Sequence, residues 1–191
     1  MTGRTHDLAA FAALNYVLIL QPLHKMSLAT AIIAVGANLI GGLTPDIDQP
    51  TADLWHKFPA GSFFGHLFAP LLGGHRYISH SLLGILLFGF LSNYILSWLG
   101  KVLLVDMQIV WWSFMIAYLS HLIMDTFTRE GVPWLFPLPF KFGFPPFRIF
   151  RVKTGSIVEK AIVFPGLIIL TGFLYYTHYS KFLDFLRHYI K

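Results

Sequence analysis

The chain has 191 residues, of which 55% are hydrophobic and only 12% are charged, and its mean hydropathy is +0.63. A soluble domain carries about 25% charged residues, so the composition predicts an all-α, polytopic membrane helical bundle rather than a soluble protein. Cysteine is absent, which excludes disulfides, a thiolate nucleophile and sulfur metal ligands. The net charge of +5 suits anionic lipid head groups, and no nucleic acid partner is expected.

The amino-terminal part of the chain predicts two membrane spans joined by a tight turn. An apolar segment covers residues 8–23 and is interpreted as a retained first span. Ser27 is expected to cap a second helix over residues 27–43, whose Ala and Gly residues favour close helix packing.

The second span ends in a turn that carries two carboxylates, with the sequence Pro45-Asp46-Ile47-Asp48-Gln49-Pro50. Because the residue before a proline avoids helical geometry, the two prolines are expected to bracket a rigid, extended pair of aspartates. In an extended backbone these carboxylates would diverge, whereas in a turn both could face one cation or bridge two.

Residues 51–74 alternate aromatic and charged side chains, which predicts a segment lying in the head-group region of the membrane. The chain then reads Gly74-His75-Arg76-Tyr77-Ile78-Ser79-His80-Ser81. A third span is expected over residues 79–98, with His80 in its first turn.

The fourth span, over residues 107–128, carries two ionisable side chains near its end. His121 and Asp125 are four residues apart and therefore share one face of a helix. Ionisable groups are costly at the end of a membrane span, so a bound metal or a paired charge would explain them.

The connection over residues 129–154 is too rich in proline to form a helix. Its phenylalanines alternate with basic residues, a pattern typical of the lipid head-group boundary. A fifth span follows over residues 157–176, with Glu159 in its first turn and at capping-box spacing from Ser156. A short amphipathic tail ends the chain, and the whole of residues 1–191 is predicted to be one membrane-embedded domain.

Five alternating spans would bring the candidate ligands to a single membrane surface. That surface also holds most of the Lys and Arg residues, which favours the cytoplasmic side of the cell membrane for it. The candidate metal ligands are His6, Asp46, Asp48, His80, His121, Asp125 and Glu159.

Each group of residues also has an alternative without function. His121 and Asp125 could form a hydrogen-bonded pair between packed helices, and the two aspartates of the turn could simply end a helix. Glu159 could be only a helix cap, and His6 a stray polar residue of a flexible terminus. His75, Arg76 and His80 could be surface residues that contact lipid phosphates.

A cluster of histidines and carboxylates is able to hold two or three divalent ions, and such ligands suit Zn, Mn, Fe or Mg. Such ions activate water and stabilise charge on a phosphoryl oxygen. Arg76 is suited to grip two phosphate oxygens. We therefore predict a hydrolase for a phosphoester in an amphiphilic substrate, with membrane lipids as partners. The alternatives are a divalent metal-ion transporter and a scaffold protein with a structural metal.

The four motifs together resemble the YdjM-type family of membrane-bound, metal-dependent hydrolases. They are Pro45-Asp46-Ile47-Asp48-x-Pro50, Gly74-His75-Arg76-x-x-Ser79-His80-Ser81, Tyr118-Leu119-Ser120-His121-x-x-x-Asp125 with Thr128-x-x-Gly131-Val132-Pro133, and Lys153-Thr154-Gly155-Ser156-x-x-Glu159. That family is similar to zinc-dependent phospholipase C and related nucleases. The resemblance implies zinc, phosphoester hydrolysis, and catalytic or substrate-binding roles for His75, Arg76 and Asp48.

The chain departs from the family pattern at two positions. Gln49 stands where members often have His, and Ser79 where they often have Thr. The second His-x-x-x-Glu pair of the soluble phospholipases has no counterpart here.

Overall fold

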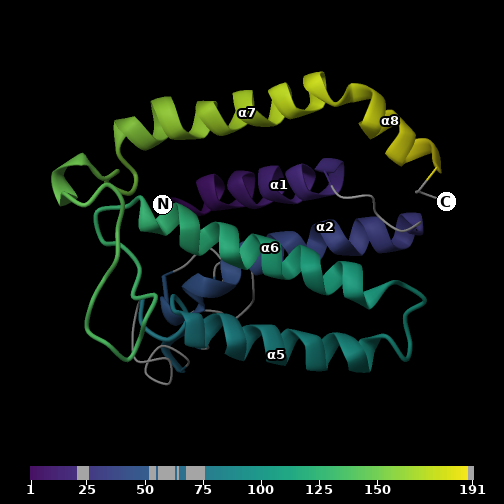
Figure 1. Ribbon diagram of the computed structural model, residues 1–191. Coiled ribbons are helices and arrows are strands. Elements are labelled where there is room, and N and C mark those ends of the chain that lie inside the picture. Colours follow the sequence, from purple (N-terminus) through teal and green to yellow (C-terminus); the bar gives the residue numbers. More distant parts are fainter. Residues whose placement is uncertain (21–25, 52–54, 56–62, 64, 68–75, 189–191) are drawn as a thin grey trace.

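The computed structural model describes residues 1–20, 26–51, 55, 63, 65–67 and 76–188. Over these residues the protein is α-helical, without β-strands, as expected for a membrane helical bundle (Figure 1). The α-helices are α1 (Gly3–Leu20), α2 (Leu28–Leu43), α5 (Leu82–Leu99), α6 (Met107–Thr126), α7 (Phe164–Thr177) and α8 (Tyr179–His188). Shorter turns are η1 (Thr44–Asp48), η2 (Arg148–Phe150) and the π-helical η3 (Glu159–Val163).

Within the described residues, four helical segments are long and apolar enough to cross a membrane. They are Leu28–Asp48, Leu82–Leu99, Met107–Thr126 and Glu159–Thr177. The first of the five expected spans differs: helix α1 begins at Gly3 instead of Leu8, so its first two turns take in Arg4 and Asp7, which lower its hydropathy. His6 therefore lies inside a helix and not in a flexible terminus.

Helix α6 forms the centre of the bundle and packs against α1, α2 and α5. Its buried residues recur every three or four positions, among them Val110, Phe114, Tyr118 and Leu122. This spacing places them on adjoining faces that are covered by the neighbouring helices.

Helices α2 and α6 approach each other closely at Gly41. A Cβ atom at this position would lie 2.3 Å from the carbonyl oxygen of Phe114, so only glycine allows the two backbones this separation. About one turn before Gly41 on the same contact, Asn38 donates a side-chain hydrogen bond of 3.0 Å to the carbonyl of Ser113. This buried bond fixes the relative register of the two helices.

Five helix ends meet at one end of the bundle (left in Figure 1). These are the amino-terminal ends of α1, α5 and the η3–α7 segment and the carboxy-terminal ends of α2 and α6. Ser27 caps α2 as predicted, through a 3.1 Å bond from the Thr30 amide. Helix α5 begins at Leu82 behind the cap Ser81, so His80 precedes this helix, contrary to the expectation that it lies in the first turn.

The expected extended turn after α2 is instead the short 3-10 helix η1, with Pro45 in its first turn. The tight winding directs Asp46 and Asp48 back toward the bundle instead of letting them diverge. This difference follows from the proline, whose fixed φ is compatible with the start of a helical turn.

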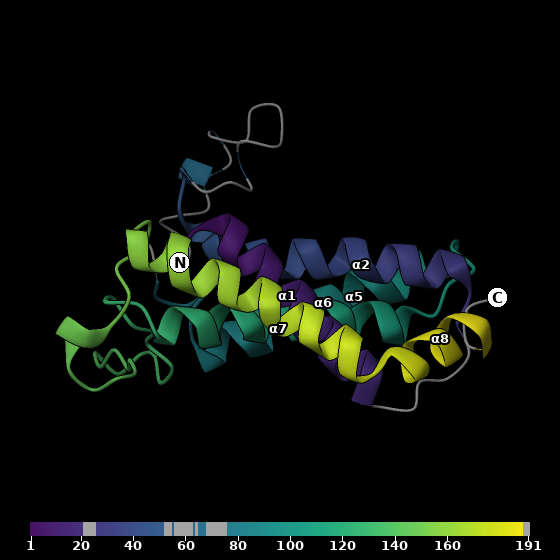
Figure 2. The same cartoon turned by 90° about the horizontal axis from the view of Figure 1, so that it is seen from above.

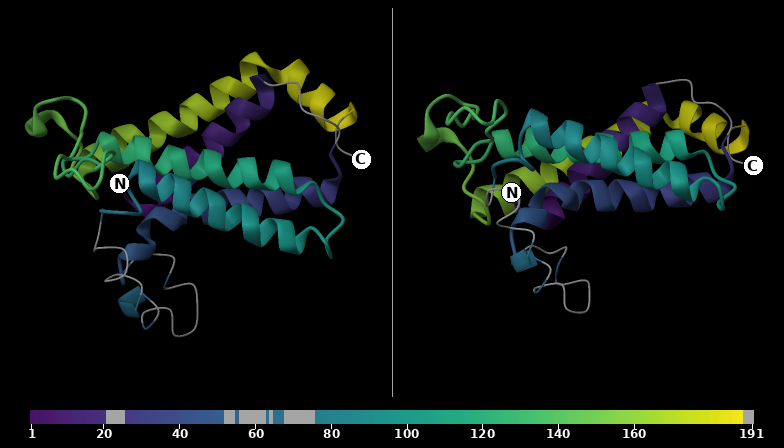
Figure 3. Two further views of the ribbon diagram at one scale, coloured as in Figure 1. Left: turned by 60° about the horizontal axis from the view of Figure 1, so that its bottom comes forward. Right: turned by 90° about the horizontal axis from the view of Figure 1, so that it is seen from below.

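The proline-rich loop over residues 128–152 extends past the same end of the bundle (Figure 2). As predicted, it contains no α-helix; two isolated bridges, Thr128 to Val152 and Val132 to Phe142, hold it together. Helix α7 packs on α1 at the edge of the bundle, and α8 turns away at the opposite end (Figure 3).

Candidate metal centre

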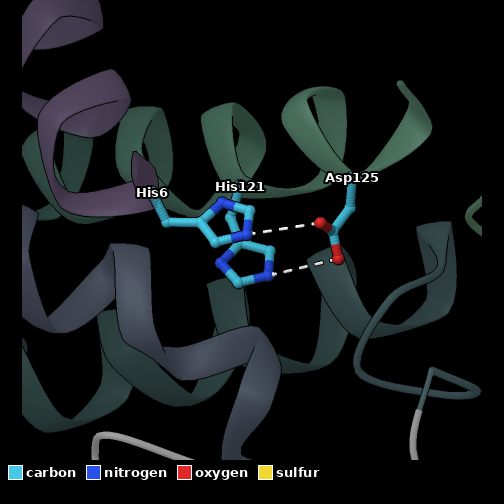
Figure 4. A group of neighbouring side chains, drawn as sticks. All are labelled: His6, His121 and Asp125. Carbon is cyan, nitrogen blue, oxygen red and sulfur yellow. Dashed lines mark ion pairs between the residues drawn. The ribbon is translucent and has the colours of Figure 1, made fainter. Parts of the chain in front are cut away.

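Two helices bring three ligand-type side chains together where α1 begins and α6 ends (Figure 4). The Asp125 Oδ1 atom lies 3.3 Å from His6 Nε2, and Asp125 Oδ2 lies 3.7 Å from His121 Nε2. The rings of His6 and His121 stack with their centroids 3.6 Å apart. One ligand atom from each of the three residues lies within 4.8 Å of the others, and all three side chains are buried.

A second group shares His121 with the first and adds side chains from η1 and from the residues before α5. His80 Nε2 and His121 Nε2 each lie 3.6 Å from Asp46 Oδ1. Their ligand atoms also fall within 4.8 Å of one another. Because His121 belongs to both groups, the two form one continuous cluster.

The cluster contains buried polar atoms that the protein itself does not satisfy. Both ring nitrogens of His6 and the Nε2 atom of His121 have no hydrogen-bond partner among the described residues. Such buried, unsatisfied nitrogens are costly. The cluster offers three imidazoles and two carboxylates whose ligand atoms lie close enough to bind a shared cation. Nitrogen and oxygen donors of this kind are the ligands that Zn²⁺ prefers when cysteine is absent. The residues present therefore fit one or two divalent cations.

Neighbouring groups orient the histidine rings of the cluster. His121 Nδ1 contacts the carbonyl oxygen of Gly42 at 2.6 Å, which turns its Nε2 toward the cluster. Ser79 donates a 2.5 Å hydrogen bond to Asp48 Oδ2 and lies 3.0 Å from His80 Nδ1. Carbonyls and carboxylates behind metal-bound histidines characteristically fix the tautomer and ring angle in this way.

The protonation of His80 reflects its carboxylate neighbours. Burial opposes the charged imidazolium, but the carboxylates of Asp125, Asp48 and Asp46 outweigh this effect and raise the pKa of His80 to about 9. In the absence of a cation this imidazole holds a proton at neutral pH, and a metal ion that binds here must displace it.

Arg76 lies in the site, but its guanidinium is held by the protein. It contacts Asp125 Oδ2 and donates bonds of 3.0 Å to Thr128 Oγ1 and 3.2 Å to the Gly131 carbonyl, and Glu130 lies 3.5 Å from its Nε. Its backbone adopts φ +60, which is rare outside glycine. A strained residue at such a position is characteristic of functional sites, where surrounding contacts hold it.

Glu159 is brought to the same end of the bundle but into neither ligand group. Its Oε1 accepts bonds from the amide and hydroxyl of Thr2 and from the hydroxyl of Thr5, at 2.6–2.8 Å. Its Oε2 accepts a 2.7 Å bond from the Gly155 amide, a helix-capping contact. Glu159 thereby ties η3 to the start of α1, beside the Met1 nitrogen that contacts Asp125.

The structure thus brings five of the seven predicted ligands into two groups and places Asp48 behind His80. His75, predicted from the resemblance to be catalytic, lies outside the described residues. His178 caps the carboxy-terminal end of α7, at the opposite end of the bundle from the cluster (Figure 1).

Three contributors to the site were given no role from the sequence, although Tyr118 and Thr128 stand in its motifs. They are the fully buried Tyr118, which donates to the Ser79 carbonyl, the Thr128 hydroxyl beneath Arg76, and the Gly42 carbonyl. Tyr118 precedes His121 by three residues on one helical face, and this spacing could have indicated it. Nothing in the sequence distinguishes the Gly42 carbonyl, because a backbone acceptor leaves no residue-type signal.

Comparison with known proteins matches residues 1–182 to the family described as YdjM inner membrane protein. The chain is 28% identical to the uncharacterized protein YvsG of Bacillus subtilis (strain 168) over 179 residues, which cover 92% of this chain and 95% of YvsG. It is 32% identical to the inner membrane protein YdjM of Escherichia coli (strain K12) over 137 residues, which cover 67% of this chain and 60% of that protein. No solved structure matches the chain.

Proposed function

We propose that this chain, which belongs to the YdjM inner membrane protein family, is a membrane-bound, metal-dependent hydrolase that cleaves a phosphoester of an amphiphilic substrate. The observation that carries the proposal is the buried cluster of His6, His121 and Asp125 joined through His121 to Asp46 and His80. These residues come from four separate segments of the chain. Packing alone does not require their imidazoles and carboxylates to converge.

The residues of the cluster have separable roles in this proposal. The five side chains of the two groups would hold divalent cations, with zinc preferred. A cation bound there would lower the pKa of a coordinated water and stabilise charge on a phosphoryl oxygen. Asp48 and Ser79 orient His80, and Arg76 holds the Asp125 carboxylate in place.

The depth of the cluster in the bundle supports an enzyme over a transporter. Transporters place ion ligands near the middle of the membrane on interrupted helices, whereas these ligands lie at the ends of α2 and α6 and the start of α1. Helix ends lie at the depth of lipid head groups. We propose a multi-pass position in the cell membrane with the cluster on the cytoplasmic side, based on the excess of Lys and Arg at that end.

The test measures hydrolysis and metal content on the same preparation. Purified protein in detergent micelles is stripped with a chelator, reloaded with zinc, and offered a panel of phospholipids and polyprenyl phosphates. We expect release of phosphate or of the neutral lipid product to be lost on stripping and restored by zinc. Asp46→Asn should abolish it, whereas Asp106→Asn, a matched change at the cap of α6 at the opposite end of the bundle, should not.

A transport assay supplies the contrary outcome. The same protein in vesicles is tested for zinc flux across the bilayer. Flux by metal-loaded protein that cleaves no member of the panel would refute the hydrolase proposal.

A further inference from the structure

A cavity of about 470 Å³ opens between α1, α6 and α7 and is not used by the metal centre. It exists because α7 packs on α1 while the facing side chains of α1, including Ala9, Ala12 and Ala13, are too small to fill the space between α6 and α7. The other walls are almost entirely apolar, with Ile123 of α6 and Leu170 of α7 about half exposed at its edges. Its volume is within the range of ligand pockets, about 300–1,000 Å³.

The apolar face of the cavity continues toward the loop at the end of the bundle. Ile123 lines the cavity, and Phe127 lies four residues further along the same face of α6, about 6 Å along the helix axis. Phe127 packs edge-on against Phe144 of the loop, with ring centroids 5.9 Å apart. Apolar side chains therefore continue from the edge of the cavity at Ile123 to the ring of Phe144 in the loop.

A second, basic pocket of about 420 Å³ lies in that loop and is lined by Arg129, Arg148 and Ile149. Both arginines are exposed, and neither forms an ion pair with a described residue. The nearest acidic neighbour in sequence, Glu130, lies instead beside the guanidinium of Arg76. Two unpaired guanidinium groups next to an exposed isoleucine match a phosphate attached to an apolar chain.

We propose that the cavity and the basic pocket together bind one anionic phospholipid, with an acyl chain between α1, α6 and α7 and the phosphate between Arg129 and Arg148. The apolar cavity faces the membrane interior, and the basic pocket lies at head-group depth. An acyl chain carrying a phosphate has this same order of apolar and charged parts.

The proposed site adjoins the metal cluster but does not include it. Thr128 and Glu130, the two neighbours of Arg129, both contact Arg76, which in turn contacts Asp125. A lipid held by Arg129 would therefore lie one layer of side chains from the cluster. Lipid binding of this kind does not depend on hydrolysis, so it extends the proposed function without resting on it.

The test uses the full chain in detergent micelles after removal of metal by a chelator. The probe is phosphatidylglycerol with a photoreactive diazirine on its acyl chain, and phosphatidylcholine with the same chain is the neutral control. We expect more label on peptides from residues 9–16, 116–124 and 167–174 than on peptides from α5. Helix α5 is an internal control because its Leu86 and Phe90 are 72% and 75% exposed at the surface of the bundle but line no described cavity.

Two pairs of variants separate the acyl-chain site from the phosphate site. Leu170→Trp fills the cavity and should prevent labelling, whereas Ile169→Trp, on the outer face of the same helix, should not. Arg129→Gln with Arg148→Gln should weaken phosphatidylglycerol binding about tenfold and leave phosphatidylcholine unchanged, whereas Lys101→Gln at the other end of the molecule should change neither.

The proposal is overturned if labels are spread evenly over α5 and the cavity helices. Equal binding of the two lipids, or equal behaviour of the two tryptophan variants, would overturn it as well. Cross-links between two copies of the chain at residues 167–174 would assign the cavity to a protein contact instead. Because no metal is needed, a negative result for hydrolysis leaves this outcome unaffected.

Discussion

Replacement of His121 should impair both ligand groups at once, because its Nε2 atom is shared between them. We predict this for His121→Asn, whose shorter amide can still donate to the Gly42 carbonyl, the partner of His121 Nδ1 at 2.6 Å. The comparison variants are His6→Asn and Asp46→Asn, each of which removes a ligand from one group only. Zinc content should therefore fall most in the His121 variant and only partly in the other two.

The expected magnitude follows from the position of the ring in the cluster. Loss of a group that merely orients a ligand costs about 10- to 100-fold in metal affinity, so loss of the shared ligand should cost at least about 100-fold. At a zinc concentration 100 times the wild-type dissociation constant, binding stabilises the wild type by about 2.7 kcal/mol. The same concentration would stabilise the variant by only about 0.4 kcal/mol.

The assay is zinc titration with elemental analysis, followed by thermal unfolding in micelles with and without zinc. The variant should unfold at the same temperature as wild type without metal and should lose most of the zinc-dependent increase. If His121→Asn keeps wild-type zinc content, or loses no more than His6→Asn, the idea of a shared ligand is wrong.

Asp48→Asn should lower zinc affinity about 10- to 100-fold without abolishing binding, because Asp48 orients His80 from behind; zinc titration measures the loss. Gly41→Ala should destabilise the protein by about 1–3 kcal/mol, since its Cβ atom would clash with the Phe114 carbonyl. The control Gly36→Ala, where a Cβ atom meets nothing within 4 Å, should be neutral or slightly stabilising in the same unfolding assay. Glu159→Gln should lower the unfolding temperature but keep the zinc content; loss of one zinc ion per chain would instead identify Glu159 as a ligand.

Much of the architecture could be predicted because a bilayer imposes strong rules on sequence. Apolar runs long enough to span it, separated by polar turns, revealed the helices to within a few residues at most ends, and the prolines of residues 133–146 excluded a helix there. The start of the first helix was predicted at residue 8 and lies at Gly3. The prediction was wrong because Arg4 and Asp7 interrupt the apolar pattern, although the backbone is already helical there. The first turn of α1 is held by a contact with another helical segment, the hydrogen bond that Thr5 donates to Glu159.

The sequence by itself determined which residues are able to bind a cation and that alternating spans bring them to one end of the bundle. Two facts suffice for that inference. The residue type gives the ligand chemistry, and the alternation of spans along the chain gives the end of the bundle at which each residue lies. Only the tertiary structure decided that His6, Asp46, His80, His121 and Asp125 share two groups while Glu159 holds the amino terminus. The physical reason is that a ligand group requires atoms within a few ångströms, and such distances are set by helix packing, such as the close approach at Gly41, which no local pattern encodes.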